Sequence, residues 1–164
     1  MKKLFIPVLL ALMSSTASAD EIEPSDFRAA LNQVTQSAKE MENVVQALEV
    51  LDGWTANWKT RKRHHDNNIC EYPKGQPELC AWYNQERDDL DRLAAAYKQQ
   101  YNSLESRYKY AKNRYEIAMS RLRFSVFLGC LKPFAARIHD CSLIEDAMLG
   151  AACLTRVWEG GCQQ

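Results

Sequence analysis

The sequence predicts an all-α fold, in which a long antiparallel helical hairpin with coiled-coil-like packing is followed by a short disulfide-rich helical C-terminal segment. Apolar residues follow heptad spacing in two long stretches, which is typical of helices that pack side by side. A polar stretch with Gly75 and two prolines separates them. Four of the six cysteines lie downstream of both stretches, which indicates a covalently closed C-terminal segment in an oxidising compartment.

Residues 1–19 carry the pattern of a secretory signal peptide. Two lysines precede an apolar run over residues 4–13, and Ala17-Ser18-Ala19 gives the small-x-small pattern that signal peptidase cleaves. We therefore expect cleavage after Ala19, a periplasmic or secreted address and a single mature domain over residues 20–164. No stretch reaches the roughly 18 apolar residues that a membrane helix needs, so no membrane span is expected.

The first predicted helix covers residues 24–63. Pro24 and Ser25 are typical of a helix N-terminus. Gly53 is a position where the helix can bend, because glycine costs about 1 kcal/mol in a helix interior relative to alanine. The apolar seam of this helix alternates steps of four and three residues and consists of Phe27, Leu31, Val34, Ala38, Met41, Val45 and Leu48.

The second predicted helix covers residues 80–128 and continues the same spacing. A helix of about 40 residues is about 60 Å long, so this element is expected to dominate the dimensions of the molecule. Its seam consists of Leu90, Ala94, Tyr97, Tyr101, Leu104, Tyr108, Ala111, Tyr115, Ala118 and Leu122.

Residues 64–79 are expected to form the loop that reverses the chain, because they are polar and contain Pro73, Gly75 and Pro77. A reversal centred near residue 73 makes the numbers of facing residues add to 145 or 146. Charge supports this register, since residues 20–52 hold eight acids and two bases while residues 107–123 hold six bases and one acid. The register places Tyr115 against Leu31, Tyr108 against Ala38, Leu104 against Met41 and Tyr101 against Val45, and it sets Lys59, Arg61, Lys62 and Arg63 across from Glu86, Asp88, Asp89 and Asp91.

Residues 129–164 form the predicted disulfide-rich segment, with one helix from Ser142 to Trp158 that is followed by two glycines. Cys70 and Cys80 flank the hairpin loop, and we expect them to pair, because a bridge there ties the two helix ends together. Such a short closed loop contributes about 2 to 3 kcal/mol in the chain-entropy model. The sequence leaves open how the other four cysteines pair, namely Cys130, Cys141, Cys153 and Cys162.

The mature chain is not expected to bind nucleic acid. The signal peptide removes two of the 21 basic residues and none of the 21 acidic ones, so the net charge becomes 19 minus 21, or −2. The run Arg107-Tyr108-Lys109-Tyr110 resembles the mixture of cations and aromatic rings in a nucleic-acid groove. However, Tyr108 is a seam residue in the predicted hairpin, and the bases of this run face an acidic helix.

No pattern of a known catalytic site occurs in the sequence. It contains no C-x-x-C pair, no G-x-S-x-G turn, no phosphate-binding glycine loop and no H-E-x-x-H helix. We therefore predict that the protein is not an enzyme and needs no cofactor. His64, His65 and Asp66 have the chemistry of metal ligands, and in a loop they could bind a divalent ion weakly. Consecutive residues of a helix point about 100° apart, so the three would converge only on an irregular backbone, and no metal site is predicted.

Three cysteines and a leucine-aspartate helix carry a resemblance to a known family. The residues are Cys70, Cys80, the run from Leu90-Asp91 to Tyr97, and Ala152-Cys153-Leu154. Together they resemble the LprI-type lysozyme inhibitor family over about residues 70–97 and 150–156. The resemblance implies an exported helical domain with paired cysteines more than it implies an activity.

We expect the protein to be an exported, non-catalytic protein-binding module of the bacterial envelope, whose partner is a secreted or envelope protein. Either a monomer or a homodimer is compatible with this role. Its contacts are predicted at the hairpin tip, because aromatic residues anchor interfaces; alternatively, these residues form an apolar cap over the loop disulfide. They are Trp54, Trp58, Tyr72, Trp82 and Tyr83. The alternative functions are a lysozyme-inhibitor-like protein and a subunit or assembly factor of a secretion or conjugation pilus machine.

Overall fold

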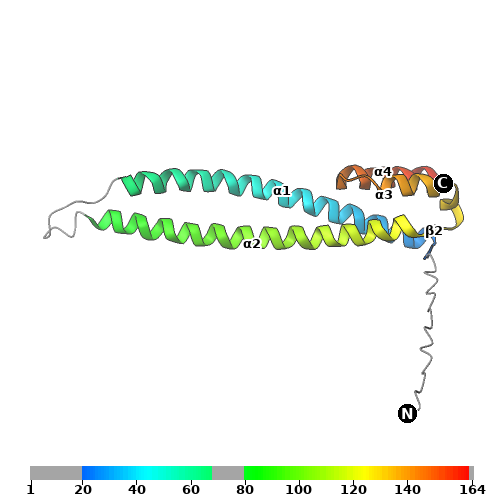
Figure 1. The fold of residues 1–164 in the computed structure, drawn as a ribbon, viewed down its shortest axis with the longest axis horizontal. Helices are drawn as coiled ribbons and strands as arrows, with labels where there is room; N and C mark the ends of the chain where they lie inside the picture. The colour runs from blue at the N-terminus through cyan, green and yellow to red at the C-terminus, as the bar shows by residue number, and fades with distance from the viewer. Residues whose placement is uncertain (1–19, 68–79, 163–164) are drawn as a thin grey trace, which may run out of the picture.

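The protein is a long helical hairpin with two short helices packed at one end. The computed structural model describes residues 20–67 and 80–162, so the predicted signal peptide and most of the predicted loop lie outside the described residues. α1 and α2 lie side by side, and α3 and α4 pack against them at the end of the hairpin where α1 begins and α2 ends (Figure 1). The predicted fold class is confirmed. The elements are β1 (Glu21–Ile22), α1 (Pro24–Asn67), α2 (Ala81–Phe124), β2 (Val126–Phe127), the 3-10 helix η2 (Gly129–Phe134), α3 (Ala135–Ser142) and α4 (Ala147–Gly161).

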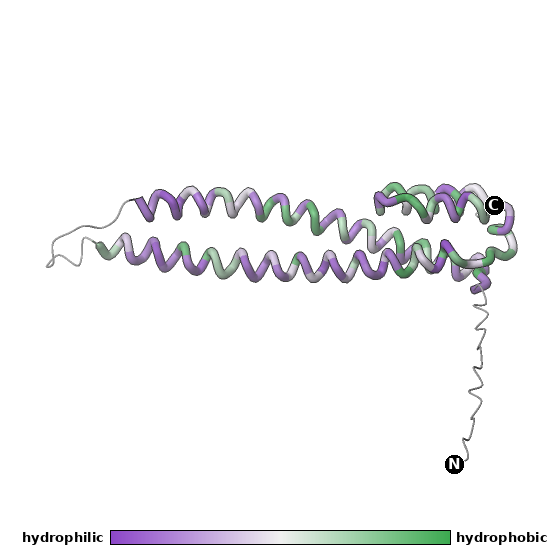
Figure 2. The backbone as a smooth tube through the Cα atoms, in the orientation of Figure 1, coloured by the Kyte–Doolittle hydropathy of each residue, from purple (hydrophilic) through white to green (hydrophobic). Residues whose placement is uncertain are grey.

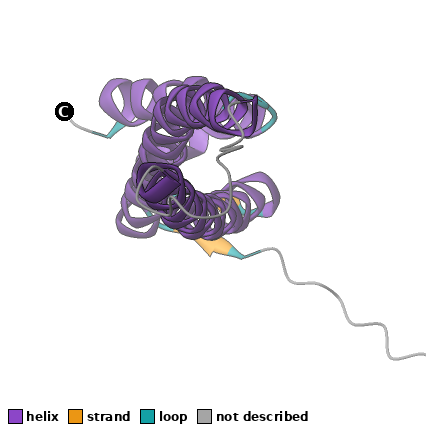
Figure 3. Ribbon diagram, turned by 90° about the vertical axis from the view of Figure 1, so that its left-hand side faces the viewer, coloured by secondary structure: helices purple, strands orange, loops and turns teal. Residues whose placement is uncertain are grey.

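The ends of the long helices differ from the prediction. α1 continues past residue 63 to Asn67, and α2 ends at Phe124 rather than at residue 128. The chain then becomes extended, and β2 pairs in parallel with β1. Figure 3 draws the strands in orange. Gly129 follows with a φ of 59°, a conformation that residues with a side chain rarely adopt. This turn brings η2 and the following helices back onto the hairpin.

The helix predicted from Ser142 to Trp158 begins too early, because residues 143–146 are not helical and a separate helix, α3, which was not predicted, precedes them. α3 ends at Ser142, and α4 begins only at Ala147. Asp146 is the N-cap of α4, since its carboxylate accepts a hydrogen bond of 2.8 Å from the backbone N–H of Leu149. An aspartate in this position starts a helix by satisfying an N–H that has no partner within it.

The hydrophobic core lies at the end of the hairpin where α3 and α4 pack, and we call this end the base. Phe27 is fully buried there, stacked on Trp158 at 5.9 Å between ring centroids and edge-on to Phe127 at 6.2 Å. Figure 2 shows that hydrophilic residues prevail along α2, whereas α4 is largely hydrophobic. The other fully buried large side chains of the base are Ile22, Val34, Leu122, Leu131, Ile138, Leu154 and Val157.

Beyond the base, the two long helices continue as a two-helix arm, which we define as residues 45–67 and 81–107. Contacts across the hairpin join residues whose numbers add to 147 or 148, so the predicted register is slightly wrong. The shift arises because the gap between the last residue of α1 and the first of α2 is centred on residue 74. The contacts join Gln33 to Arg114, Glu40 to Arg107, Trp58 to Leu90, Arg61 to Glu86 and His65 to Tyr83.

The charge pattern that supported the hairpin acts through two cross-helix ion pairs. Arg107 lies 2.7 Å from Glu40, and Arg61 lies 2.8 Å from Glu86. Both pairs are exposed, so each stabilises the hairpin by about 0 to 1 kcal/mol. Lys62 instead pairs within α1, at 2.8 Å from Asp66. The pairs therefore contribute more to register than to stability.

The predicted seam of α1 is buried at the base but not in the arm. Val45, which was expected to face Tyr101, is 44% exposed, and Tyr101 is 50% exposed. α1 packs against both α2 and α4, and it uses two different faces to do so. α4 begins next to Val45, so the face of α1 that packs against α4 is uncovered from Val45 toward the tip. The row toward α2 has a seven-residue repeat and includes Ala30, Ser37, Val44, Leu51 and His65.

Candidate functional site

The hairpin tip contains two aromatic side chains that pack inside the arm. Trp58 is half-buried, and its indole N–H donates a hydrogen bond of 2.9 Å to the carbonyl oxygen of Leu90 on α2. Tyr83 is also half-buried, and its ring stacks on the imidazole of His65 with 4.0 Å between centroids. These two predicted contact residues therefore link α1 to α2 at the tip. Whether they also cover the loop disulfide stays a prediction, because Cys70 lies outside the described residues.

Two other predicted contact residues point into solvent. Trp54 is 54% exposed and Trp82 is 56% exposed. Trp82 lies edge-on to Tyr83 at 5.9 Å, at the start of α2. Trp82 lines the same pocket as His65. Trp54 lies eleven residues before His65, which corresponds to about 16 Å along α1, so Trp54 and Trp82 do not form one patch. Tyr72 lies outside the described residues. That any of these residues binds a partner stays a prediction.

Trp82 borders a pocket of about 700 Å³ between the ends of α1 and α2. The pocket combines this indole with charged groups of both signs, including the ion pair of Arg61 and Glu86. Aromatic and polar side chains also occur together in protein–protein interfaces. The remaining lining residues are Thr60, His64, His65, Gln85 and Asp89.

The imidazole of His65 is buried and connects α1 to α2 at the tip. Its Nε2 lies 3.1 Å from the carbonyl oxygen of Tyr83, so Nε2 must carry the proton. Its Nδ1 lies 3.5 Å from the Asp66 carboxylate. The Lys62 ammonium hydrogen-bonds the same carboxylate and lowers the pKa of Asp66 below its ordinary value. Among the described residues, no three histidine, cysteine or acidic side chains come together as metal ligands.

A second surface, which the sequence analysis missed, is a groove of about 960 Å³ at the junction of base and arm. We call it the base groove. α1 and α2 form its floor, and the turn between α3 and α4 forms one wall. In the sequence, only the apolar residues around position 143 point to this groove. Its other walls depend on where α4 begins, which the spacing of apolar residues does not show. Its apolar lining includes Met41, Val45, Tyr108, Met119, Leu143, Ile144 and Met148.

The base groove has an excess of acidic side chains. Its two basic residues are already engaged, because Lys112 lies 3.8 Å from Glu116, and Arg123 donates a hydrogen bond of 2.7 Å to the carbonyl oxygen of Ser142. The other acids of the groove make no ion pair with any residue that the structure describes, so the groove is negatively charged as well as apolar. They are Glu42, Glu49, Glu145 and Asp146.

Tyr115 lies under the base groove and is buried at 8% exposure. Its hydroxyl is enclosed and has no hydrogen-bond partner within the part of the chain that the structure describes. A Cβ atom added to Gly150 would lie 2.7 Å from this hydroxyl, which explains why a glycine stands there. Burial raises the pKa of the Tyr115 phenol above its ordinary value, and the negative charge of Asp146 adds to the effect.

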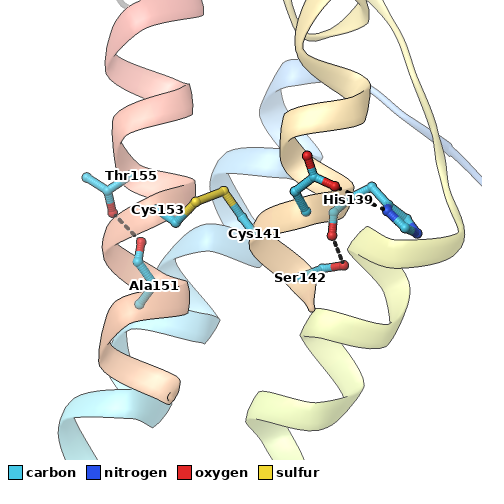
Figure 4. The surroundings of a disulfide bond; sticks show 7 residues. His139, Cys141, Ser142, Ala151, Cys153 and Thr155 are labelled. Atoms are coloured by element: carbon cyan, nitrogen blue, oxygen red, sulfur yellow. Dashed lines mark hydrogen bonds and ion pairs between the residues drawn. A yellow bond between two sulfur atoms is a disulfide. The ribbon is translucent and has the colours of Figure 1, made fainter. Parts of the chain in front are cut away.

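The disulfides resolve the pairing that the sequence left open. Cys130 pairs with Cys162, and Cys141 pairs with Cys153, which joins α3 to α4 (Figure 4). Cys80 is also disulfide-bonded, whereas Cys70, its predicted partner, lies outside the described residues. No cysteine between residues 80 and 162 carries a free thiol. Disulfides of this kind suit a protein outside the reducing cytoplasm.

None of the helices in the described ranges combines the length and the apolar character that crossing a membrane requires. Comparison of the chain with family models, with curated proteins and with solved structures gives no match, so the resemblance to the LprI-type family stays a prediction.

Proposed function

We propose that the protein is a non-catalytic protein-binding module of the bacterial envelope, and that it binds a secreted or envelope protein through Trp82 at the arm tip. The observation that carries this proposal is the exposure of a tryptophan, 56% accessible, beside a pocket at the free end of a long arm. Tryptophan is among the residues that contribute most to interface affinity. Covering such an exposed aromatic ring with a partner removes apolar surface from water, which favours binding.

The surroundings of Trp82 support a binding role because they are ordered before any partner arrives. The Trp58 hydrogen bond to Leu90, the stacking of Tyr83 on His65 and the Arg61–Glu86 pair tie α1 to α2 next to it. A surface that is already held in place loses less conformational entropy on binding. The base, closed by two disulfides, provides the fixed support for this arm.

The envelope address rests on the signal-peptide pattern of residues 1–19 together with the disulfides. Within this address, the partner is either a single secreted hydrolase, as for a lysozyme-inhibitor-like protein, or a component of a secretion or conjugation pilus machine. The test below separates the two.

The test is a crosslinking pull-down from a native envelope with the mature, disulfide-bonded protein and with its Trp82→Ala variant. We expect the wild type to capture a partner that the variant loses. Tyr101→Ala is the matched control, because it removes another half-exposed aromatic ring of α2 away from the tip. Circular dichroism verifies that all three proteins remain helical.

Identification of the captured proteins by mass spectrometry decides between the partner classes. One hydrolase whose activity falls on addition of the protein indicates an inhibitor, whereas several components of one complex indicate a machine subunit. Equal capture by the wild type and Trp82→Ala would exclude the tip as the binding surface.

A further inference from the structure

α2 carries a second apolar row, on a face that no described element covers. Tyr110, Ile117 and Phe124 are spaced seven residues apart and are 66%, 57% and 70% exposed. Seven-residue spacing keeps the three side chains on one face of the helix. Rows of this kind are normally buried against another helix, so the exposure of this row calls for an explanation.

The row is interleaved with arginines, which are also seven residues apart. Arg107, Arg114 and Arg121 alternate with the apolar residues in steps of three and four along the same side of the helix. Arg107 already pairs with Glu40 of α1, so Arg114 and Arg121 are the cations that can meet a partner. The guanidinium of Arg114 lies over the Tyr110 ring at 5.7 Å from its centroid. We call these six residues the outer stripe. It is apolar and basic and contains no acidic residue.

The outer stripe and the base groove are complementary in chemistry and similar in length. The groove is apolar and acidic, with four carboxylates that lack an ion-pair partner among the described residues. It follows α2 from Tyr108 to Arg123, which corresponds to about 22 Å. The stripe extends over about 26 Å, from Arg107 to Phe124.

We propose that the base groove of one copy of this chain binds the outer stripe of α2 of a second copy. Ile117 and Phe124 of one copy then cover Val45 and Met148 of the other, which are 44% and 37% exposed in the single copy. Methionine side chains adapt well to such a contact, because they are flexible and polarisable. Arg114 and Arg121 lie against the acidic rim of the groove, where the pairing of opposite charges favours this partner over a like-charged surface.

The two surfaces cannot serve a symmetric pair. Ile117 and Met119 are two residues apart on α2, about 200° around the helix, so the stripe and the groove face opposite sides. A copy whose groove is filled still presents a free stripe to the next copy. The contact is therefore head-to-tail, which builds a ring or a filament rather than a closed dimer. It uses neither Trp54 nor Trp82 and is independent of the function proposed for the tip.

Sedimentation velocity of the mature, disulfide-bonded protein over a range of concentrations tests the assembly. We expect species larger than a dimer at high concentration and a shift toward monomer at high ionic strength. Ile117→Glu breaks the stripe and Val45→Lys breaks the groove, and each variant alone should be monomeric. Both side chains are exposed in the single copy, so neither change disturbs its core.

Mixing the two variants gives the sharpest result. Ile117→Glu retains an intact groove and Val45→Lys retains an intact stripe, so an equimolar mixture should form a species of two chains and nothing larger. Val50→Glu is the control, because Val50 is 56% exposed but belongs to neither surface, and it should assemble like the wild type. A wild type that stays monomeric, or a mixture that does, would overturn the proposal, as would a dimer that both variants leave intact.

Discussion

Tyr115 places a hydroxyl group in the core of the base without a described partner. Leaving a buried donor unsatisfied costs about 1 to 3 kcal/mol. Tyr115→Phe removes the hydroxyl and keeps the ring, so we expect the free energy of unfolding to rise by about 1 kcal/mol at neutral pH. Urea denaturation measures the change, and Tyr110→Phe, with its exposed ring, should leave the value unchanged.

The same residue predicts a dependence on alkaline pH. The pKa of Tyr115 is raised in the folded state above its ordinary value of 10.0, so the folded protein holds this proton more tightly than the unfolded chain does. Below pH 10 the phenol is protonated in both states, and its ionisation does not change the free energy of unfolding. As the pH rises from 10 toward the folded-state pKa, the unfolded chain loses the proton first, and the free energy of unfolding falls. The wild type should therefore lose stability faster than Tyr115→Phe above pH 10, and parallel losses would contradict the burial of this phenol.

Single residues also mark where sequence analysis of the tip succeeded and where it stopped. The aromatic content of the tip was evident from the sequence, but spacing could not separate Trp58, which bonds to Leu90, from Trp54, which is exposed. That distinction depends on which side of α1 meets α2. The N-cap role of Asp146 was accessible from residue type alone and was missed.

At the scale of elements, the heptad pattern predicted both long helices and their antiparallel pairing. It could not reveal that α1 packs against two partners, because one apolar stripe in a sequence does not show how many helices cover it. Because α4 begins only at Ala147, it does not cover predicted seam residues such as Val45, and these residues line the base groove instead. The acidic groove thus arose from tertiary packing rather than from a motif.

Substitutions in α1 distinguish the observed packing from the predicted seam. Leu51, absent from the predicted seam, is 5% exposed, whereas Val45 is 44% exposed. Leu51→Ala should lower the free energy of unfolding by about 2 kcal/mol or more, and Val45→Ala by less than about 0.5 kcal/mol. Urea denaturation of dilute protein measures both changes. A larger loss for Val45→Ala would show that the arm packs in the predicted register after all.

At the scale of the whole molecule, the base depends on its disulfides. Cys130–Cys162 spans 32 residues and Cys141–Cys153 spans 12. Replacing each pair by serines should lower the free energy of unfolding by about 4 and about 3 kcal/mol respectively, because the longer loop restricts the unfolded chain more. Thermal unfolding followed by circular dichroism gives the order, and a larger loss for the shorter loop would point to strain or solvation instead.

The bridge from Cys130 to Cys162 also sets how the molecule responds to mechanical tension. Asp20 and Cys162 both lie at the base, since β1 pairs with β2 and the bridge returns the end of α4 to η2. A pull applied at Cys162 passes through the disulfide to Cys130, so α3 and α4 lie outside the load-bearing path. Between Asp20 and Cys130 the hairpin is loaded as a zipper: the base must yield first, and the arm then opens turn by turn toward its tip.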